Sequence, residues 1–498
     1  MKNFKKIIGL LLSTVMVLSM VLTATAADTF SLTINGTTSG HTYNLYQIFK
    51  GDVAAEGTGK VLSNIGWGDN IATDGLAGAS INEAATDAAA TLSSEADAKA
   101  FAKTIDTNRA TLLTGTPATA TATGDTTVVT DLAPGYYFVE DATNLQDQDS
   151  SYTSFILVVV GDAEVTIKAD KPTLEKKVKD VNDSTTAEGV WQDSADYDIG
   201  DDVPFQLTAK LPSNYADYET YKLVFNDTLS AGLDYKEGSL KVSYVNGTTS
   251  VDVSDTSYTL DVTGKNITVT FNNLKTITEV NKDSKIVVEY TATLNNSAVI
   301  GATGNENTAS ITYSNDPNHS GEGDTNTGKT PDDKVKVFTY QVVVNKTDKD
   351  GNPLEGAGFT LYKKDSTGNY QPVGEEITGV TTFTFKGLDD GDYKLVETTF
   401  PAKYNKMDDV EFTIEATHDE TSDTPTLTNL TGSVTTGDAE FTPDVSSGSL
   451  TTSVKNYMGS ELPETGGMGT KVIYLVGGAL VVLASVLLVT KRRMSKNQ

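Results

Sequence analysis

Three polar residues near the C-terminal end of the chain fall on strand faces that are otherwise apolar. Side chains alternate between the two faces of a β-strand, so residues two apart share a face. By this rule Lys346 follows Tyr340, Val342 and Val344 on one strand face. Glu397 follows Tyr393 and Leu395 on a second face, and Asn456 follows Leu450, Thr452 and Val454 on a third. Any one of them alone could be a polar group that reaches solvent at a strand end. Together they predict an amine, a carboxylic acid and a carboxamide in one core.

Burial would make these groups reactive. Desolvation favours the neutral form of each ionisable group, the free amine of Lys346 and the carboxylic acid of Glu397. A neutral amine is a nucleophile, and a protonated acid can polarise a carboxamide and assist proton transfer. The expected product is an internal amide between Lys346 and Asn456, formed with loss of ammonia.

The middle of the chain repeats this pattern with an aspartate as the acid. Lys176 shares a face with Leu174 and Val178, and Asp227 lies on a strongly apolar face. Asn307 supplies the carboxamide, although Asn305, two residues earlier, lies on the same strand face and remains an alternative. The pattern predicts a second amide, between Lys176 and Asn307.

The first part of the chain lacks the full set. Glu140 ends a short motif, Leu132–Glu140, which is similar to Leu388–Glu397 with one residue deleted. No lysine occurs between Asp28 and Ile48, and Lys50 is the only local substitute. We therefore expect no cross-link there, although the first and last domains should share a topology.

Two ranges resemble collagen-adhesin domains of Gram-positive surface proteins. Residues 340–457 resemble the B-type domain and residues 172–315 the A-type domain, in which an Asp replaces the Glu. The resemblance implies that all six residues act in autocatalytic isopeptide formation.

The two ends of the chain carry export and anchoring signals. Residues 1–26 have the basic start, apolar run and small residues of a signal peptide. Residues 472–490 are uncharged and long enough to span a bilayer, and Lys491, Arg492 and Arg493 follow. The preceding motif is Leu462, Pro463, Glu464, Thr465 and Gly466. Motif, span and basic tail resemble a cell-wall sorting signal, which implies that a sortase cysteine attacks the Thr465 carbonyl.

Composition excludes several functions. The net charge is −29, and removal of three cations with residues 1–26 and of five with residues 466–498 lowers it to −37. Nucleic-acid binding is therefore excluded on charge. The chain has no cysteine, and its histidines, His41, His319 and His418, stand apart in polar contexts. We expect no enzyme, no cofactor and no metal site.

Short runs rich in Val, Thr, Tyr and Ile, broken by Gly, Asn and Asp, predict an all-β chain of tandem immunoglobulin-like sandwiches. An alanine-rich stretch, 81–105, predicts a short helical insertion in the first domain. The expected divisions are 1–26, 27–170, 171–335, 336–460 and 461–498.

Length, domain order and sorting signal resemble the major backbone pilins of sortase-assembled pili. The resemblance implies a pilus shaft subunit that is secreted and anchored to the cell wall. Its implied partners are a class C sortase, other copies of the chain, accessory or tip pilins, and peptidoglycan through a housekeeping sortase. The implied acceptor of Thr465 is Lys168, with Lys171 as the rival. A monomeric wall-anchored adhesin is the alternative.

Overall fold

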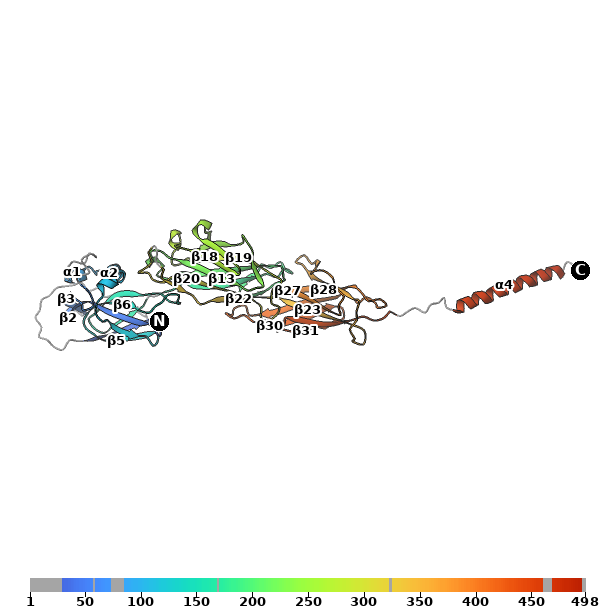
Figure 1. The fold of residues 1–498 in the computed structure, drawn as a ribbon, viewed down its shortest axis with the longest axis horizontal. Helices are drawn as coiled ribbons and strands as arrows, with labels where there is room; N and C mark the ends of the chain where they lie inside the picture. Colours follow the sequence, from blue (N-terminus) through green and yellow to red (C-terminus); the bar gives the residue numbers. More distant parts are fainter. Residues whose placement is uncertain are drawn as a thin grey trace, which may run out of the picture.

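The computed structural model describes residues 29–56, 59–72, 85–167, 170–321, 325–459 and 468–494. Three bodies, each built on two sheets, lie end to end along the long axis (Figure 1). We call them the first domain (29–167), the middle domain (170–338) and the last domain (340–459). The expected all-β architecture is confirmed.

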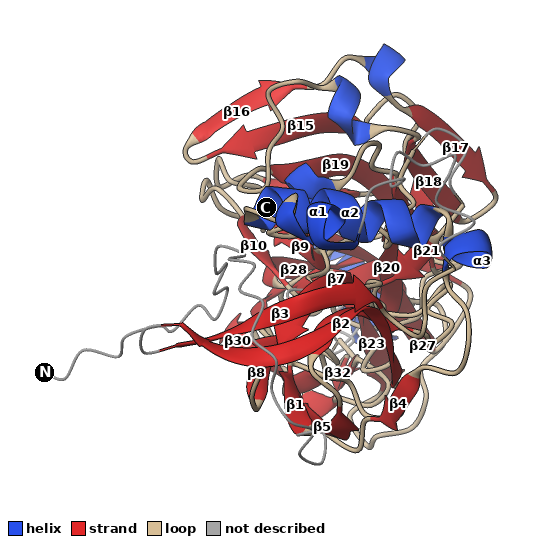
Figure 2. Ribbon diagram, turned by 90° about the vertical axis from the view of Figure 1, so that its left-hand side faces the viewer, coloured by secondary structure: helices blue, strands red, loops and turns tan. Residues whose placement is uncertain are grey.

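The first domain has three layers. The sheet β3-β2-β6-β7 lies between the helices on one face and the smaller sheet β5-β1-β8 on the other (Figure 2). Alternation along β6 separates two cores, because Phe138 packs against the helices and Val139 against the small sheet. The expected helical insertion is confirmed. The elements are β1 (Phe30–Asn35), β2 (Thr42–Glu56), β3 (Gly59–Trp67), α1 (Ala85–Ala90), α2 (Glu95–Thr107), α3 (Arg109–Leu112), β4 (Ala118–Thr121), β5 (Thr126–Leu132), β6 (Gly135–Asp141), β7 (Ser154–Val159) and β8 (Ala163–Thr166).

The middle domain packs two large sheets around one core. The first sheet has the order β10-β9-β12-β19-β15-β16, with β14 beside β19, and the second has the order β11-β22-β20-β13-β18-β17, with β21 beside β20. Because β22 pairs with β20, this domain continues to Phe338, beyond the expected division at 335. The elements are β9 (Thr173–Asp180), β10 (Val190–Gln192), β11 (Ser194–Asp196), β12 (Asp202–Lys210), β13 (Leu223–Leu229), β14 (Leu233–Tyr235), β15 (Lys241–Asn246), β16 (Thr249–Asp252), β17 (Thr259–Thr263), β18 (Asn266–Phe271), β19 (Lys285–Leu294), β20 (Asn305–Ser314), β21 (Thr327–Lys329) and β22 (Asp333–Phe338), with 3₁₀ turns at Tyr215–Asp217, Asp255–Ser257 and Leu274–Thr276.

The last domain pairs its first and last strands in parallel, β23 with β32, as the first domain pairs β1 with β8. The corresponding motifs also agree, because Tyr137 and Tyr393 each donate a hydroxyl hydrogen bond to the carbonyl four residues earlier. The two domains therefore share a topology. The elements are β23 (Tyr340–Thr347), β24 (Gly358–Lys364), β25 (Tyr370–Pro372), β26 (Ile377–Thr378), β27 (Thr382–Leu388), β28 (Gly391–Thr399), β29 (Val410–His418), β30 (Leu427–Thr436), β31 (Thr442–Asp444) and β32 (Ser449–Lys455).

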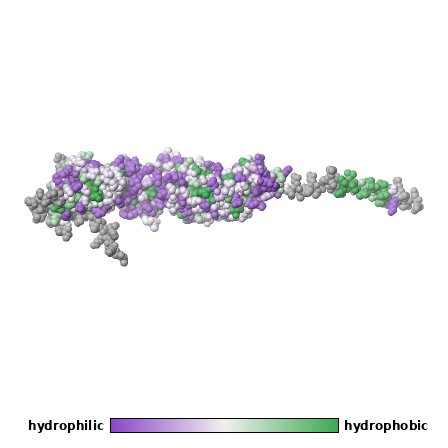
Figure 3. Space-filling view, turned by 90° about the horizontal axis from the view of Figure 1, so that it is seen from below, coloured by the Kyte–Doolittle hydropathy of each residue, from purple (hydrophilic) through white to green (hydrophobic). Residues whose placement is uncertain are grey.

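A single helix, α4 (Met468–Met494), follows the last domain in sequence. Its window Val472–Arg492 has a mean hydropathy of 2.7 and is long and apolar enough to cross a membrane. Apolar surface gathers on this helix, whereas the three domains are largely hydrophilic outside (Figure 3).

Candidate functional site

In the middle domain, four polar side chains meet between the two sheets. Lys176 on β9 and Tyr290 on β19 point inward from one sheet, and Asp227 on β13 and Asn307 on β20 point inward from the other. Each predicted residue is at most 3% exposed. The alternation along four strands thus brings the predicted amine, acid and carboxamide together in one core.

Hydrogen bonds link these four side chains in a row. Lys176 Nζ lies 2.5 Å from Asp227 Oδ2, which also accepts a 2.9 Å hydrogen bond from the Tyr290 hydroxyl. Asn307 Nδ2 donates to the same hydroxyl at 2.6 Å. Tyr290 was not predicted from the sequence, because an inward tyrosine in an apolar strand has the same pattern as any core aromatic residue.

Electrostatics in this core favours neutral partners. Burial lowers the pKa of Lys176, although Asp227 acts in the opposite sense. Burial also raises the pKa of Asp227, against the influence of Lys176. A neutral amine beside a protonated acid is the pair that nucleophilic attack on a carboxamide requires.

The rival carboxamide serves another purpose. Asn305 Oδ1 accepts a hydrogen bond from the Val299 N–H, and Asn305 Nδ2 donates to the carbonyls of Val299 and Val337. These contacts tie a loop to β22. Asn305 is therefore fully engaged with backbone groups, whereas Asn307 faces the amine cluster.

In the last domain, Lys346, Glu397 and Asn456 are each at most 1% exposed. Lys346 Nζ donates to Asn456 Oδ1 at 2.6 Å, and Asn456 Nδ2 donates to Glu397 Oε1 at 2.8 Å. The amine lies 3.5 Å from that same Glu397 oxygen. Burial lowers the pKa of Lys346. The acid thus contacts both the amine and the nitrogen that would leave as ammonia.

In the first domain, Glu140 faces away from the position that Glu397 occupies in the last domain. Tyr137 and Tyr393 make the same hydroxyl hydrogen bond, so the two motifs align without a gap, and Asp141, not Glu140, matches Glu397. The expected alignment with one residue deleted is therefore wrong, and Glu140, one residue earlier, lies on the other face. Glu140 therefore pairs with Arg109 of α3, and Asp141, on the face of Tyr137 and Val139, pairs with His41 at 2.6 Å. Lys50, the possible substitute, pairs with Asp69 in an exposed position.

The anchoring residues are only partly visible. The motif Leu462–Gly466 and Lys168 lie outside the described residues. Lys171 is described, and its ammonium contacts the carboxylate and the backbone carbonyl of Asp149, with 43% of its side chain exposed. Just before Lys168, Val165 and Ile167 both pack against the first-domain core and so share one face of the chain.

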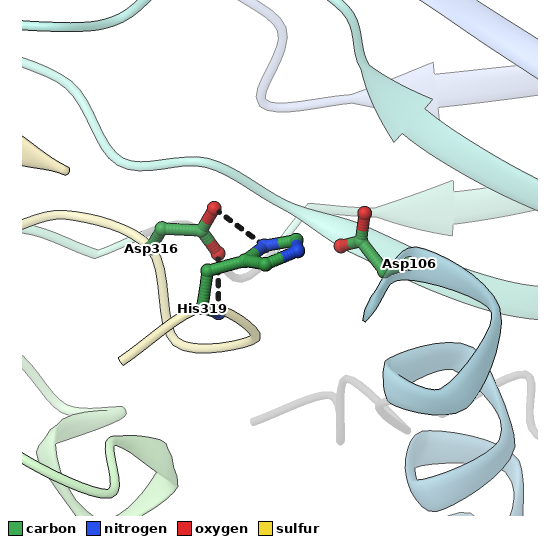
Figure 4. A group of neighbouring side chains, drawn as sticks. All are labelled: Asp106, Asp316 and His319. Atoms are coloured by element: carbon green, nitrogen blue, oxygen red, sulfur yellow. Dashed lines mark hydrogen bonds and ion pairs between the residues drawn. The ribbon is translucent and has the colours of Figure 1, made fainter. Parts of the chain in front are cut away.

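One histidine and two aspartates lie close together where the first and middle domains meet. His319 lies between Asp316 of its own loop and Asp106 at the end of α2 (Figure 4). The carboxylates are already engaged, because Asp106 Oδ2 accepts from Ser154 and Asn318, and Asp316 Oδ2 lies 3.1 Å from His319 Nδ1. The arrangement is therefore explained as a hydrogen-bonded seam between domains.

The junction of the middle and last domains holds one buried lysine among three acids. Lys363 Nζ lies 2.5 Å from Asp183, 2.6 Å from Asp198 and 3.3 Å from Asp389. Burial alone would lower the pKa of Lys363, but Asp389 and Asp198 raise it above its usual value. This ammonium stays charged, and the contacts form an ionic clamp.

Two further acids at this junction, Asp180 and Asp390, form no close ion pair with a lysine or arginine among the described residues, although His418 lies near both. Burial, with Asp196 nearby, raises the pKa of Asp180 to about 7 and that of Asp390 to about 6. Both carboxyls line a cavity of about 430 Å³ together with His418. The junction therefore holds protons that an exposed aspartate would release.

Comparisons with known proteins agree with this architecture. A family model described as "Gram-positive pilin backbone subunit 2, Cna-B-like domain" matches residues 199–317. One described as "SpaA: Prealbumin-like fold domain" matches residues 340–430. The first of these ranges falls in the domain that we expected to be of the A-type, whereas the matching model describes it as B-like.

A curated protein and a solved structure, both from Streptococcus pyogenes serotype M6, are similar to the chain. The trypsin-resistant surface T6 protein is 27% identical over 267 residues, which are 48% of this chain and 44% of that protein. The chain thus spans less than half the length of this relative. The structure of the T6 backbone pilin superposes with a TM-score of 0.56 at 17% identity, over 88% of this chain and 100% of that one, which shows a shared fold.

We predict that rising pH weakens the junction of the middle and last domains. A buried acid with a raised pKa binds its proton more tightly in the closed junction, so stability falls as pH rises from about 4 towards the raised values. Protection of the Ile199 N–H, which donates to the Gly387 carbonyl across the junction at 3.0 Å, should fall accordingly in amide exchange.

The double change Asp180→Asn and Asp390→Asn should flatten this dependence. The exposed change Asp261→Asn on β17 is the matched control and should leave it intact. A protection factor for the Ile199 N–H that is the same at about pH 5 and pH 8, after correction for the intrinsic pH dependence of exchange, would contradict the prediction.

Proposed function

We propose that this chain, which carries domains of the Gram-positive backbone pilin type, is the shaft subunit of a covalently polymerised surface pilus. The observation that carries the proposal is the pair of buried amine, acid and carboxamide clusters in consecutive domains. A shaft must bear tension along the chain, and such clusters can form covalent bonds without cysteine.

The internal bonds would form by the same steps in both domains. The neutral lysine nitrogen attacks the asparagine Cγ, one proton passes from that nitrogen to the leaving nitrogen, and ammonia departs. In the last domain Glu397 is placed for this transfer, since one oxygen lies 3.5 Å from Lys346 Nζ and 2.8 Å from Asn456 Nδ2. No oxidant or cofactor is needed.

The position of the last-domain bond suits a load-bearing role. Lys346 lies near the end of β23, and Asn456 directly follows β32, the parallel partner of β23. An amide between them would join residues 110 apart in sequence, so that tension passes through the bond and not through the strands between. By analogy with disulfides, closing such a loop stabilises by about 4 kcal/mol.

Polymerisation would use the ends of the chain. A pilus-specific class C sortase would cleave after Thr465 and pass it to Lys168 of the next copy, and a housekeeping sortase would attach the finished polymer to peptidoglycan. The apolar helix α4 would hold the precursor in the membrane until cleavage. The contact of Lys171 with Asp149 favours Lys168 as the acceptor, because Lys171 is already engaged.

We predict that the chain, made without any sortase, has a mass lower than its calculated mass by two ammonia molecules. Asn307→Ala should lose the middle-domain bond alone, and Glu397→Gln the last-domain bond alone. Tryptic mass spectrometry should find Lys176 joined to Asn307 and Lys346 joined to Asn456.

Asn305→Ala is the matched control for Asn307→Ala. It removes backbone hydrogen bonds and should cost about 1–3 kcal/mol of stability while both amides still form. A mass equal to the calculated value in the unchanged protein would refute internal cross-linking.

A second prediction concerns assembly in cells. Immunoblots of boiled wall extracts should show a ladder of polymers, and Lys168→Ala should collapse it, whereas Lys171→Ala should leave it. A ladder that survives Lys168→Ala but is lost with Lys171→Ala would reassign the acceptor. A single band from the unchanged protein would support the monomeric adhesin.

A further inference from the structure

The middle-domain cluster differs from the last-domain cluster in how its acid reaches the carboxamide. Glu397 contacts Asn456 Nδ2 directly. Asp227 contacts the amine of Lys176, but the hydrogen bond that the structure gives to Asn307 Nδ2 goes to the Tyr290 hydroxyl. Neither Asp227 Oδ1 nor Asn307 Oδ1 has a hydrogen-bond partner among the described residues.

The Tyr290 hydroxyl occupies the gap between acid and leaving nitrogen. It lies 2.9 Å from Asp227 Oδ2 and 2.6 Å from Asn307 Nδ2, so one oxygen contacts both groups. The ring is fixed by stacking on Phe205 at a centroid distance of 5.5 Å. The side chain is 2% exposed, which excludes bulk water from the same task.

We propose that Tyr290 is a catalytic residue of the middle-domain reaction and relays a proton from Asp227 to Asn307 Nδ2. This inference rests on the proposed amide between Lys176 and Asn307. The side chain of aspartate is one methylene shorter than that of glutamate. The tyrosine hydroxyl bridges the remaining distance between the acid and the carboxamide.

Lys176 Nζ attacks Asn307 Cγ as a neutral amine, and in the tetrahedral intermediate Nδ2 gains a lone pair that can accept a proton. The Tyr290 hydroxyl, which donates to Asp227 Oδ2 in the structure, turns towards this lone pair. Protonated Asp227 then donates to the Tyr290 oxygen while the hydroxyl proton moves to Nδ2. Ammonia leaves, the excess proton of Nζ passes to Asp227, and the amide, free ammonia and a protonated acid remain.

The pKa values agree with a neutral relay. Burial raises the pKa of Asp227, so the acid can hold the proton that it must deliver. Burial also raises the pKa of Tyr290 well above its usual value, with Asp227 adding to the shift, so the phenol stays protonated between transfers. A hydroxyl that gives one proton while it takes another carries no net charge.

The test compares two bonds within one molecule. The full chain carrying Tyr290→Phe is made in a cell-free reaction with detergent, and both cross-linked peptides are followed by mass spectrometry over time. We expect the bond of Lys176 to form at least about tenfold more slowly, since a general acid–base group contributes that much or more. The bond of Lys346 should form at its usual rate.

Tyr235→Phe is the matched control. Tyr235 packs beside Tyr290 at 5.9 Å, and its buried hydroxyl has no hydrogen-bond partner among the described residues, so its loss should change neither bond. Amide exchange of β13 and β20 reports whether the middle domain is folded.

Three results would overturn the inference. A middle-domain bond that forms at the usual rate in folded Tyr290→Phe shows that the hydroxyl is dispensable. A middle domain that fails to fold in this variant assigns the hydroxyl a structural role. Absence of the bond in the unchanged chain refutes the proposed cross-link itself, and with it the relay.

Discussion

The burial of a lysine amine between two sheets is the constraint on which the middle and last domains depend. An isolated ammonium in an apolar core is strongly destabilising, so the fold must supply an acid from another strand. For Lys176 this acid comes from the opposite sheet, and for Lys346 the acid on β28 again faces it across the sandwich. Strand order, register and parity must all be correct for these contacts to form.

Strand parity made much of this predictable from the sequence. The alternation of apolar and polar residues along a strand can be read from the sequence alone. It therefore assigned Lys176, Asp227, Lys346 and Glu397 to inner faces. Asn307 and Asn305 share a parity, and their difference lies in which backbone groups a loop brings near. Sequence pattern carries no information of that kind.

The same rule shows why the first domain departs from the others. Its motif is similar to that of the last domain, yet in the gapless alignment Asp141 takes the place of Glu397 on the inner face and Glu140 falls on the opposite face. A match of residue types suggested equivalence, whereas the register decides it. Tyr290 was not predicted for a related reason. Its proposed role depends on the hydroxyl, whereas the sequence pattern indicates only an aromatic ring on an apolar strand face.

Lys363 forms ion pairs, whereas Lys176 and Lys346 are the lysines of the proposed internal amides. All three are buried, so desolvation acts on each in the same direction. Lys176 and Lys346 each face one close acid, and burial prevails, so the pKa of each amine falls. Lys363 faces three acids at the domain junction, and their attraction exceeds the effect of burial. The number of close carboxylates thus accounts for the opposite directions of the pKa shifts of these three buried lysines. The two proposed nucleophiles lie inside domains, where a permanent bond would preserve one fold, and the Lys363 ammonium lies between domains, where its contacts are reversible.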